Sequence, residues 1–142
     1  VVAKALRPDV AIFHAQTADR HGNVSCGYEA EAVILAEASA HVIVTAERIV
    51  DQLTEKEAKG AFIPAIHVDT VVHAPFGAHP SGCAGLYGPD KIHMREYVLA
   101  SKDDASFETY LKTYVHGVRN HDEYVERLVP LEWKQPTRAA GA

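Results

Sequence analysis

An uninterrupted apolar segment that directly follows a helix-forming segment constrains the fold most. Residues 41–46 read His-Val-Ile-Val-Thr-Ala, a β-branched and apolar run typical of a strand covered on both faces. Residues 29–40 are rich in Ala, Glu and Leu and predict a helix. Residues 9–15, after Pro8, predict an earlier buried strand. This order predicts an α/β fold with an open, mostly parallel sheet and helices packed on it.

The remaining segments complete the predicted fold. Residues 66–74 alternate apolar and polar until Pro75 and predict a third strand with one wetter face or at the margin of the sheet. Residues 47–60 are charged and predict short solvated helical turns. An apolar stripe over residues 107–115 and a capping pattern at Asn120 predict two C-terminal helices. We expect the tail after Trp133 to be frayed.

Length and charge narrow the class of protein. A chain of 142 residues predicts a single α/β domain over 1–142. Three strands form a narrow sheet with uncovered edges, so we expect the chain to be part of a larger sheet or assembly. The net charge of -5 and the absence of Lys/Arg clusters exclude nonspecific binding to nucleic acid or to anionic membranes. No apolar stretch reaches the roughly 18 residues that span a bilayer.

The residues most often used in catalysis form no known motif here. The chain has nine histidines but no His-Glu-x-x-His pattern, and His67 and His73 would lie about 20 Å apart on one strand; the sequence predicts no metal site. Cys26 and Cys83 match neither a disulfide framework nor a zinc knuckle, which favours reduced thiols and a cytoplasmic location, although a single disulfide remains open. Glu47 is equally compatible with a general base and with a solvated helix cap.

A polar loop after the first predicted strand is the first candidate binding segment. Gln16, Asp19, Arg20 and Asn23 place two amides, a carboxylate and a guanidinium together, a set that can bind an acidic or amide-rich ligand. An equally weighted alternative is that Asp19 and Arg20 hydrogen-bond the turn itself.

A glycine-rich loop is the second candidate. Residues 77–82 read Gly-Ala-His-Pro-Ser-Gly, and Gly77, His79 and Ser81 suit a pocket lining or a subunit contact. The alternative is a surface Ω-loop packed on Phe76 and Tyr87.

Several motifs occur together in a characteristic order. Arg-Pro-Asp-Val-Ala-Ile-Phe-His-Ala-Gln at 7–16 is followed by Ala-Asp-Arg-x-Gly-Asn at 18–23. Val-Thr-x-Glu-x-Ile-Val at 44–50 and Val-Asp-x-Val-Val-His-x-Pro-x-Gly-Ala-His-Pro at 68–80 come next. Tyr-Leu-Lys-x-Tyr-Val at 110–115 and His-Asp-x-Tyr at 121–124 extend the set over nearly the whole chain. In this order the chain resembles the A (alpha) subunit of class I coenzyme A transferases, of the glutaconate CoA-transferase type.

The resemblance implies a function that needs a second protein. It implies an open α/β subunit that pairs with a B (beta) subunit, commonly as a heterotetramer. It implies transfer of coenzyme A between an acyl-CoA and a small carboxylic acid through a glutamyl-CoA thioester on the B subunit. This chain would then carry no catalytic residue and no permanently bound cofactor, because the coenzyme A thioester is a substrate. The substrate-binding residues expected from the two loops are Gln16, Asp19, Arg20, Asn23, Gly77, His79 and Ser81.

Other interpretations remain open within this resemblance. The motifs correspond to the C-terminal half of an A subunit, so we expect the isolated chain to be inactive. A related branch of the fold cleaves a ring carbon bond in steroid-derived CoA thioesters and shares the His-Ala-Gln and Gly-Ala-His-Pro motifs. The matches at 68–73 and 121–124 favour the transferase. A non-catalytic interaction domain or remnant is the alternative from another class.

Overall fold

A computed structural model of the chain describes residues 4–134, so the tail predicted to fray lies outside the described residues from 135 onward. The described chain forms two compact units, residues 4–78 with 83–86 and residues 79–82 with 87–134. The single domain expected over 1–142 stays a prediction.

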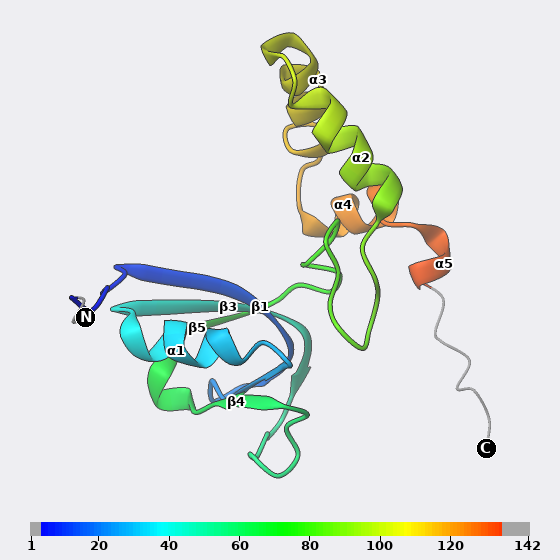
Figure 1. Cartoon of the computed structure of the whole chain (residues 1–142). Helices are drawn as coiled ribbons and strands as arrows, with labels where there is room; N and C mark the ends of the chain where they lie inside the picture. Colours follow the sequence, from blue (N-terminus) through cyan, green and yellow to red (C-terminus); the bar gives the residue numbers. More distant parts are fainter. Residues whose placement is uncertain (1–3, 135–142) are drawn as a thin grey trace. The chain divides into compact units, whose positions relative to one another are not determined.

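The first unit is an open, mixed sheet (Figure 1) with strand order β4-β2-β1-β3-β5. The pairs β1–β3 and β3–β5 are parallel, and the pairs β1–β2 and β2–β4 are antiparallel. The predicted open α/β sheet is confirmed, with two further strands, β2 and β4, at one side; of the five strands only β2 runs opposite to the others. Its elements are β1 (Val10–Asp19), β2 (Val24–Gly27), α1 (Ala30–Ala38), β3 (His41–Val50), β4 (Ala61–Ile63), the 3-10 helix η1 (Ala65–His67) and β5 (Thr70–His73).

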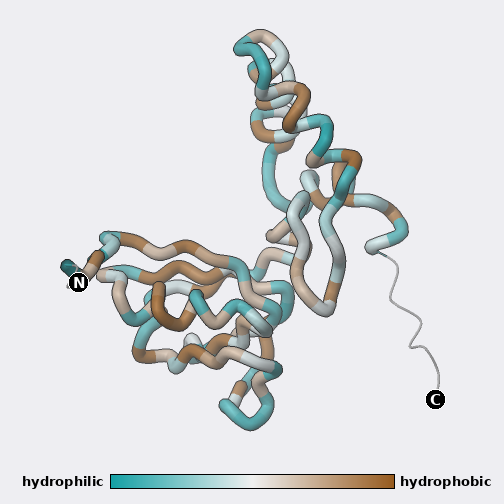
Figure 2. Tube along the Cα trace, in the orientation of Figure 1, coloured by the Kyte–Doolittle hydropathy of each residue, from teal (hydrophilic) through white to brown (hydrophobic). Residues whose placement is uncertain are grey.

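Small and β-branched side chains form the core of this unit. Alternate residues of β3 are buried, namely Val42, Val44 and Ala46, as expected for the side-chain period of a strand. Ala32 and Ala36 of α1 belong to the same buried cluster, and alanines let a helix approach a sheet closely. Figure 2 shows the central strands as mostly apolar tubes. The sequence pattern therefore identified these strands, but coverage of both faces is wrong for β1, where Val10 and Ile12 are exposed.

The strands differ from the predicted bounds. Both long strands extend further than predicted. β1 includes residues 16–19, which were predicted as a loop, and β3 includes residues 47–50, which were predicted as solvated turns. Their polar residues are satisfied across the sheet, because Arg48 donates from its guanidinium to Thr17 Oγ1 at 3.2 Å. The third predicted strand is shorter than expected, since residues 65–67 form the 3-10 helix.

The second unit consists of helices α2 (Lys91–Ala100), α3 (Asp104–Tyr114), α4 (His121–Leu128) and α5 (Leu131–Lys134). The two predicted C-terminal helices are α3 and α4, and Asn120 caps α4 by accepting a hydrogen bond from Glu123 N at 2.9 Å. The sequence analysis did not predict α2, whose apolar residues Ile92 and Val98 are exposed. Over residues 4–134, no helix has the length and apolar character that crossing a membrane requires.

Candidate functional site

A polar cluster lies near the middle of β1 and β3, next to the point where β5 ends. His14 and Thr45 are neighbours in the parallel register, and Glu47 shares their face because it follows Thr45 by two residues. His14 Nε2 lies 2.6 Å from Glu47 Oε1, and His14 Nδ1 lies 2.8 Å from Thr45 Oγ1. The side chains of His14 and Glu47 are 13% and 8% exposed. Hydrogen bonds at such largely buried positions are stronger than hydrogen bonds exposed to water.

The segment after β5 packs directly on this cluster. Phe76 N donates to Glu47 Oε2 at 2.8 Å, and Phe76 has a left-handed backbone with φ 58, a conformation that costs energy for a non-glycine residue. A Cβ on Gly77 would lie 2.8 Å from both the Ala74 carbonyl oxygen and His14 Cε1, so only glycine fits there without movement. Glu47 and His14 therefore set the conformation of residues 76–77.

The segment 83–86 reaches the same face of the sheet. The Gln16 side-chain amide donates to the carbonyl oxygen of Ala84. The Cys83 thiol is buried, and this burial, together with the charges of Glu47 and Glu29, raises its pKa to about 11. Cys83 is therefore a protonated thiol at neutral pH and a poor nucleophile.

Cys26, the other cysteine, is also a free, buried thiol. Burial and the nearby Glu29 and Cys83 raise its pKa to about 12. The structure joins neither of these two cysteines in a disulfide, and their reduced state stays a prediction.

The turn between β1 and β2 is held by Asp19. This side chain is completely buried, and its two oxygens accept hydrogen bonds from four groups. These donors are His21 N at 2.9 Å, Asn23 N at 2.9 Å, Asn23 Nδ2 at 2.8 Å and Leu53 N at 2.9 Å. Gly22 completes the turn with φ +100, a backbone that favours glycine. In this geometry Asp19 fixes the loop rather than facing a ligand.

Asn23 and Arg20 have different surroundings in the same turn. The Asn23 side chain also accepts a hydrogen bond from Ala65 N at 3.0 Å, so it links two loops. The Arg20 side chain is 75% exposed and pairs with the exposed Asp51 at 3.3 Å. Exposed pairs of this kind contribute little to stability, so the Arg20 guanidinium can exchange Asp51 for an anionic ligand.

An open groove of about 460 Å³ lies beside this turn in the first unit. Its lining combines a guanidinium, two imidazoles and two aspartates with apolar strand residues, a mixture of polar groups and apolar surface typical of a binding groove. The lining includes Arg20, His21, Ile49, Asp69, Val71 and His73.

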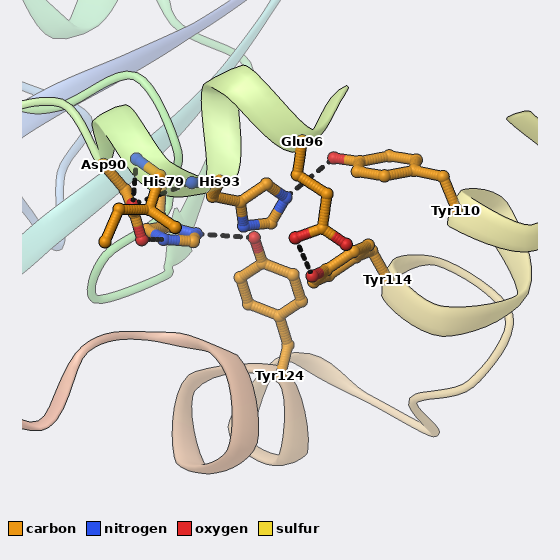
Figure 3. Close-up of polar contacts among 8 residues, drawn as sticks. His79, Asp90, His93, Glu96, Tyr110, Tyr114 and Tyr124 are labelled. Carbon is orange, nitrogen blue, oxygen red and sulfur yellow. Dashed lines mark hydrogen bonds and ion pairs between the residues drawn. The ribbon is translucent and has the colours of Figure 1, made fainter. Parts of the chain in front are cut away.

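The second unit has a polar core of its own, shown in Figure 3. His79 is buried, with Nε2 3.2 Å from Asp90 Oδ2 and Nδ1 2.6 Å from the Tyr124 hydroxyl. His93 Nε2 lies 2.7 Å from the Tyr110 hydroxyl. Burial and the nearby His79 lower the pKa of His93, which favours its neutral form. These bonds join the loop at His79 to α2, α3 and α4.

This polar core shifts the pKa values of both Asp90 and Tyr124. Burial by itself raises the pKa of Asp90, but hydrogen bonds from His93 N and from His79 outweigh it, so the pKa lies below its usual value. Burial raises the pKa of Tyr124 to about 12. The phenol therefore stays protonated and remains a hydrogen-bond partner for His79.

Removing the Tyr124 hydroxyl tests this core. We expect Tyr124→Phe to lower the free energy of unfolding by about 1–3 kcal/mol, because a ring nitrogen of the buried His79 loses its partner. The measurement is the urea midpoint followed by far-ultraviolet circular dichroism. Tyr28→Phe is the control, since Tyr28 is exposed; equal midpoints for the two variants would contradict the role of the hydroxyl.

The predicted site residues fall in three places. Gln16 and Gly77 lie at the His14–Glu47 cluster, and the turn carries Asp19, Arg20 and Asn23. His79 and Ser81 belong to the second unit. Their binding roles stay predictions.

The predicted site residues do not include His14, Glu47 and Cys83, which the structure brings together. Glu47 is neither a solvated cap nor a free base, because it lies within β3 and binds His14 and Phe76. The signal present in the sequence was the placement of His14 and Glu47 within the His-Ala-Gln and Val-Thr-x-Glu motifs.

Comparisons with known proteins identify similar chains. A family model described as coenzyme A transferase matches residues 1–74. The A subunit of glutaconate CoA-transferase from Acidaminococcus fermentans is 41% identical over 122 residues, covering 84% of this chain and 38% of the relative. The cholesterol ring-cleaving hydrolase IpdA subunit of Rhodococcus jostii is 30% identical over 131 residues, covering 87% of this chain and 43% of the relative.

The crystal structure of glutaconate coenzyme A-transferase from Acidaminococcus fermentans matches with a TM-score of 0.78 and 39% identity. The match covers 85% of this chain and 39% of that one. The chain thus spans about two fifths of the length of these relatives.

Proposed function

The chain belongs to the coenzyme A transferase family, and on that premise we propose that it is part of the A subunit of an enzyme that transfers coenzyme A between an acyl-CoA and a carboxylic acid. The family membership confirms the resemblance carried by the sequence motifs. The observation that carries the proposal is the similarity, in both sequence and fold, to the A subunit of glutaconate CoA-transferase. The acyl-CoA is a substrate, and no permanently bound cofactor takes part in the proposed reaction.

The proposed reaction places the nucleophile on a B subunit. A glutamate carboxylate of this partner attacks the thioester carbonyl, the C–S bond breaks, and an acyl-glutamyl anhydride and the CoA thiolate form. The thiolate then attacks the glutamyl carbonyl, which gives the glutamyl-CoA thioester and releases the first acid. The second acid enters by the reverse of these steps. Glu47 of this chain is not that nucleophile, because its two oxygens already bind His14 and Phe76 N.

The residues of this chain are proposed to bind and orient the substrates. Arg20 pairs with a substrate carboxylate or a CoA phosphate, because its guanidinium is exposed at the groove. Gln16 and Gly77 shape the wall formed by residues 74–78 and 83–86. Asp19 and Asn23 act on the substrate indirectly, by fixing the turn that carries Arg20.

The assembly proposed is a heterotetramer of A and B subunits in the cytoplasm. His79 and Ser81 of the second unit are proposed to contribute to a pocket wall or to the subunit contact. The cytoplasmic location is supported by the two free cysteines.

Reconstitution with the B subunit tests the proposal. The product of the whole gene, purified together with its B subunit, is incubated with an acyl-CoA and a free carboxylic acid, and exchange is followed by liquid chromatography. We expect transfer only with both subunits, together with a hydroxylamine-sensitive CoA adduct on the B subunit. Robust transfer by this chain alone would contradict the proposal, and inactivity of the intact assembly toward every acyl-CoA would favour a non-catalytic domain.

A CoA-thioester ring-cleaving hydrolase is the second candidate, because the similarity to the cholesterol ring-cleaving hydrolase covers most of the chain as well. The two are separated by the products from an alicyclic CoA thioester. A hydrolase adds water to the ring and leaves the thioester intact, whereas a transferase moves CoA to an added acid. Ring opening without CoA exchange would contradict the transferase proposal and support the hydrolase.

Arg20 offers a direct test of substrate binding. We expect Arg20→Ala to raise the KM for the anionic substrate by about 10-fold, the loss of one charge-assisted hydrogen bond, while the urea midpoint is unchanged. Steady-state kinetics of the A–B complex give the KM. Lys56→Ala is the matched control, since it removes an exposed positive charge of the same unit outside the groove. An unaltered KM in a normally assembled complex would reject the role of Arg20.

A further inference from the structure

Three side chains in the first unit bring different ligand atoms to one place. His14, Glu47 and Cys83 offer a ring nitrogen, a carboxylate oxygen and a sulfur, and these atoms all lie within 4.8 Å of one another. Imidazole, carboxylate and thiolate are the side chains that bind Zn²⁺ in proteins, and three of them leave one position open for water or another ligand. We propose that these residues form a binding site for a single Zn²⁺ ion.

The surroundings of the ligands support this assignment. His14 Nδ1 contacts Thr45 Oγ1 at 2.8 Å, and Thr45 Oγ1 lies within 3.5 Å of the Phe13 carbonyl oxygen. A hydroxyl that donates to Phe13 accepts the Nδ1 proton, which leaves Nε2 as the atom that faces the ion. The second oxygen of Glu47 accepts from Phe76 N at 2.8 Å. Metal-binding histidines and carboxylates are oriented by contacts of this kind.

Binding replaces a proton with the ion. In the structure, His14 Nε2 and Glu47 Oε1 share one hydrogen bond at 2.6 Å. Zn²⁺ between these atoms displaces the shared proton, and coordination by Cys83 displaces the thiol proton, so both protons leave to solvent. The ion would then tie the segment 83–86 to β1 and β3 through three bonds.

A second cluster of ligand atoms is less suited to a metal ion. His79, Asp90 and His93 also bring ligand atoms within 4.8 Å of one another. However, both ring nitrogens of His79 have partners in Tyr124 and Asp90, and Asp90 Oδ1 accepts from two backbone N–H groups that begin α2. An ion there would disrupt the start of a helix, whereas at His14 the supporting contacts remain.

The test uses the whole chain with metal ions alone and needs no enzyme activity. Isothermal titration with Zn²⁺ is expected to give one ion per chain, and Co²⁺ is expected to give a sulfur-to-cobalt charge-transfer band. Cys83→Ser should remove the band and weaken Zn²⁺ binding by about 100-fold or more, because one of three ligands loses its sulfur. Cys26→Ser is the matched control, since Cys26 is the other buried free thiol, and should keep both signals.

A further variant keeps all three ligands and changes only their support. Thr45→Val removes the hydroxyl that orients His14 and should weaken Zn²⁺ binding by about 10- to 100-fold. Circular dichroism verifies that each variant is folded. Absence of stoichiometric binding to the folded chain, a band that survives Cys83→Ser, or Zn²⁺ affinity untouched by both Cys83→Ser and Thr45→Val would overturn the site.

Discussion

Replacing Asp19 with alanine is expected to lower the free energy of unfolding by about 3–5 kcal/mol, because four donors lose their buried acceptor at once. The affected donors lie in two separate segments, the turn at residues 21–23 and the loop at Leu53. The side chain is completely buried, so water cannot replace it without movement of the chain. The turn that presents Arg20 would lose its fixed conformation together with this stability.

Urea unfolding of the variant and the parent chain measures this effect. Asp51→Ala is the matched control, because it removes a carboxylate that is almost fully exposed and whose ion pair with Arg20 lies at the surface; it should change the unfolding free energy by less than about 0.5 kcal/mol. Similar losses for Asp19→Ala and Asp51→Ala would show that the buried hydrogen bonds do not hold the turn.

The same carboxylate predicts a pH dependence. Burial raises the pKa of Asp19, but the hydrogen bonds from Asn23, Leu53 and His21 outweigh this effect, so the folded pKa lies below the ordinary value. The stabilisation is therefore complete above the unfolded pKa, about 3.9, and is lost as the pH falls through the folded pKa. The stability gap between the parent chain and Asp19→Asn should narrow over that acidic range.

Local patterns predicted the elements that have continuous or periodic apolar residues in the sequence. The centres of β1 and β3 and the helices α1, α3 and α4 follow from continuous or periodic apolar residues. The ends of β1 and β3 were missed because some polar residues there find partners across the sheet, as Arg48 does with Thr17. Nothing local distinguishes such an end from a solvated loop.

The site was harder to predict because its contacts join distant segments. Asp19 and Asn23 have the composition of a ligand-binding loop, but Leu53 and Ala65 are among their partners, and no spacing rule predicts those contacts. The His14–Glu47 pair depends on the parallel register of β1 and β3. The ordered motifs, in contrast, were sufficient to identify the family.

Substituting Gly77 with alanine should lower both the stability of the chain and its transfer rate more than a substitution at an exposed position of the same loop region. The added Cβ would lie 2.8 Å from a backbone oxygen of Ala74 and from the His14 ring, so the ring or the turn must move. Overpacking of this kind costs about 1–3 kcal/mol of stability. If the wall at residues 74–78 and 83–86 positions the substrate, as the proposed function requires, a shift of this size lowers transfer by about 100-fold.

Gly88→Ala separates this effect from the general cost of losing a glycine. A Cβ on Gly88 would meet nothing within 4 Å, so that variant should keep both its stability and its transfer rate in the A–B complex. The kcat of each complex is measured at a temperature where both variants are fully folded, which removes loss of folded protein as a cause. A stable Gly77→Ala complex with the parent kcat would show that His14 and the turn can move apart without an effect on transfer. The residues that position the substrate would then have to lie elsewhere, and the groove at Arg20 would remain as the place that binds the acid.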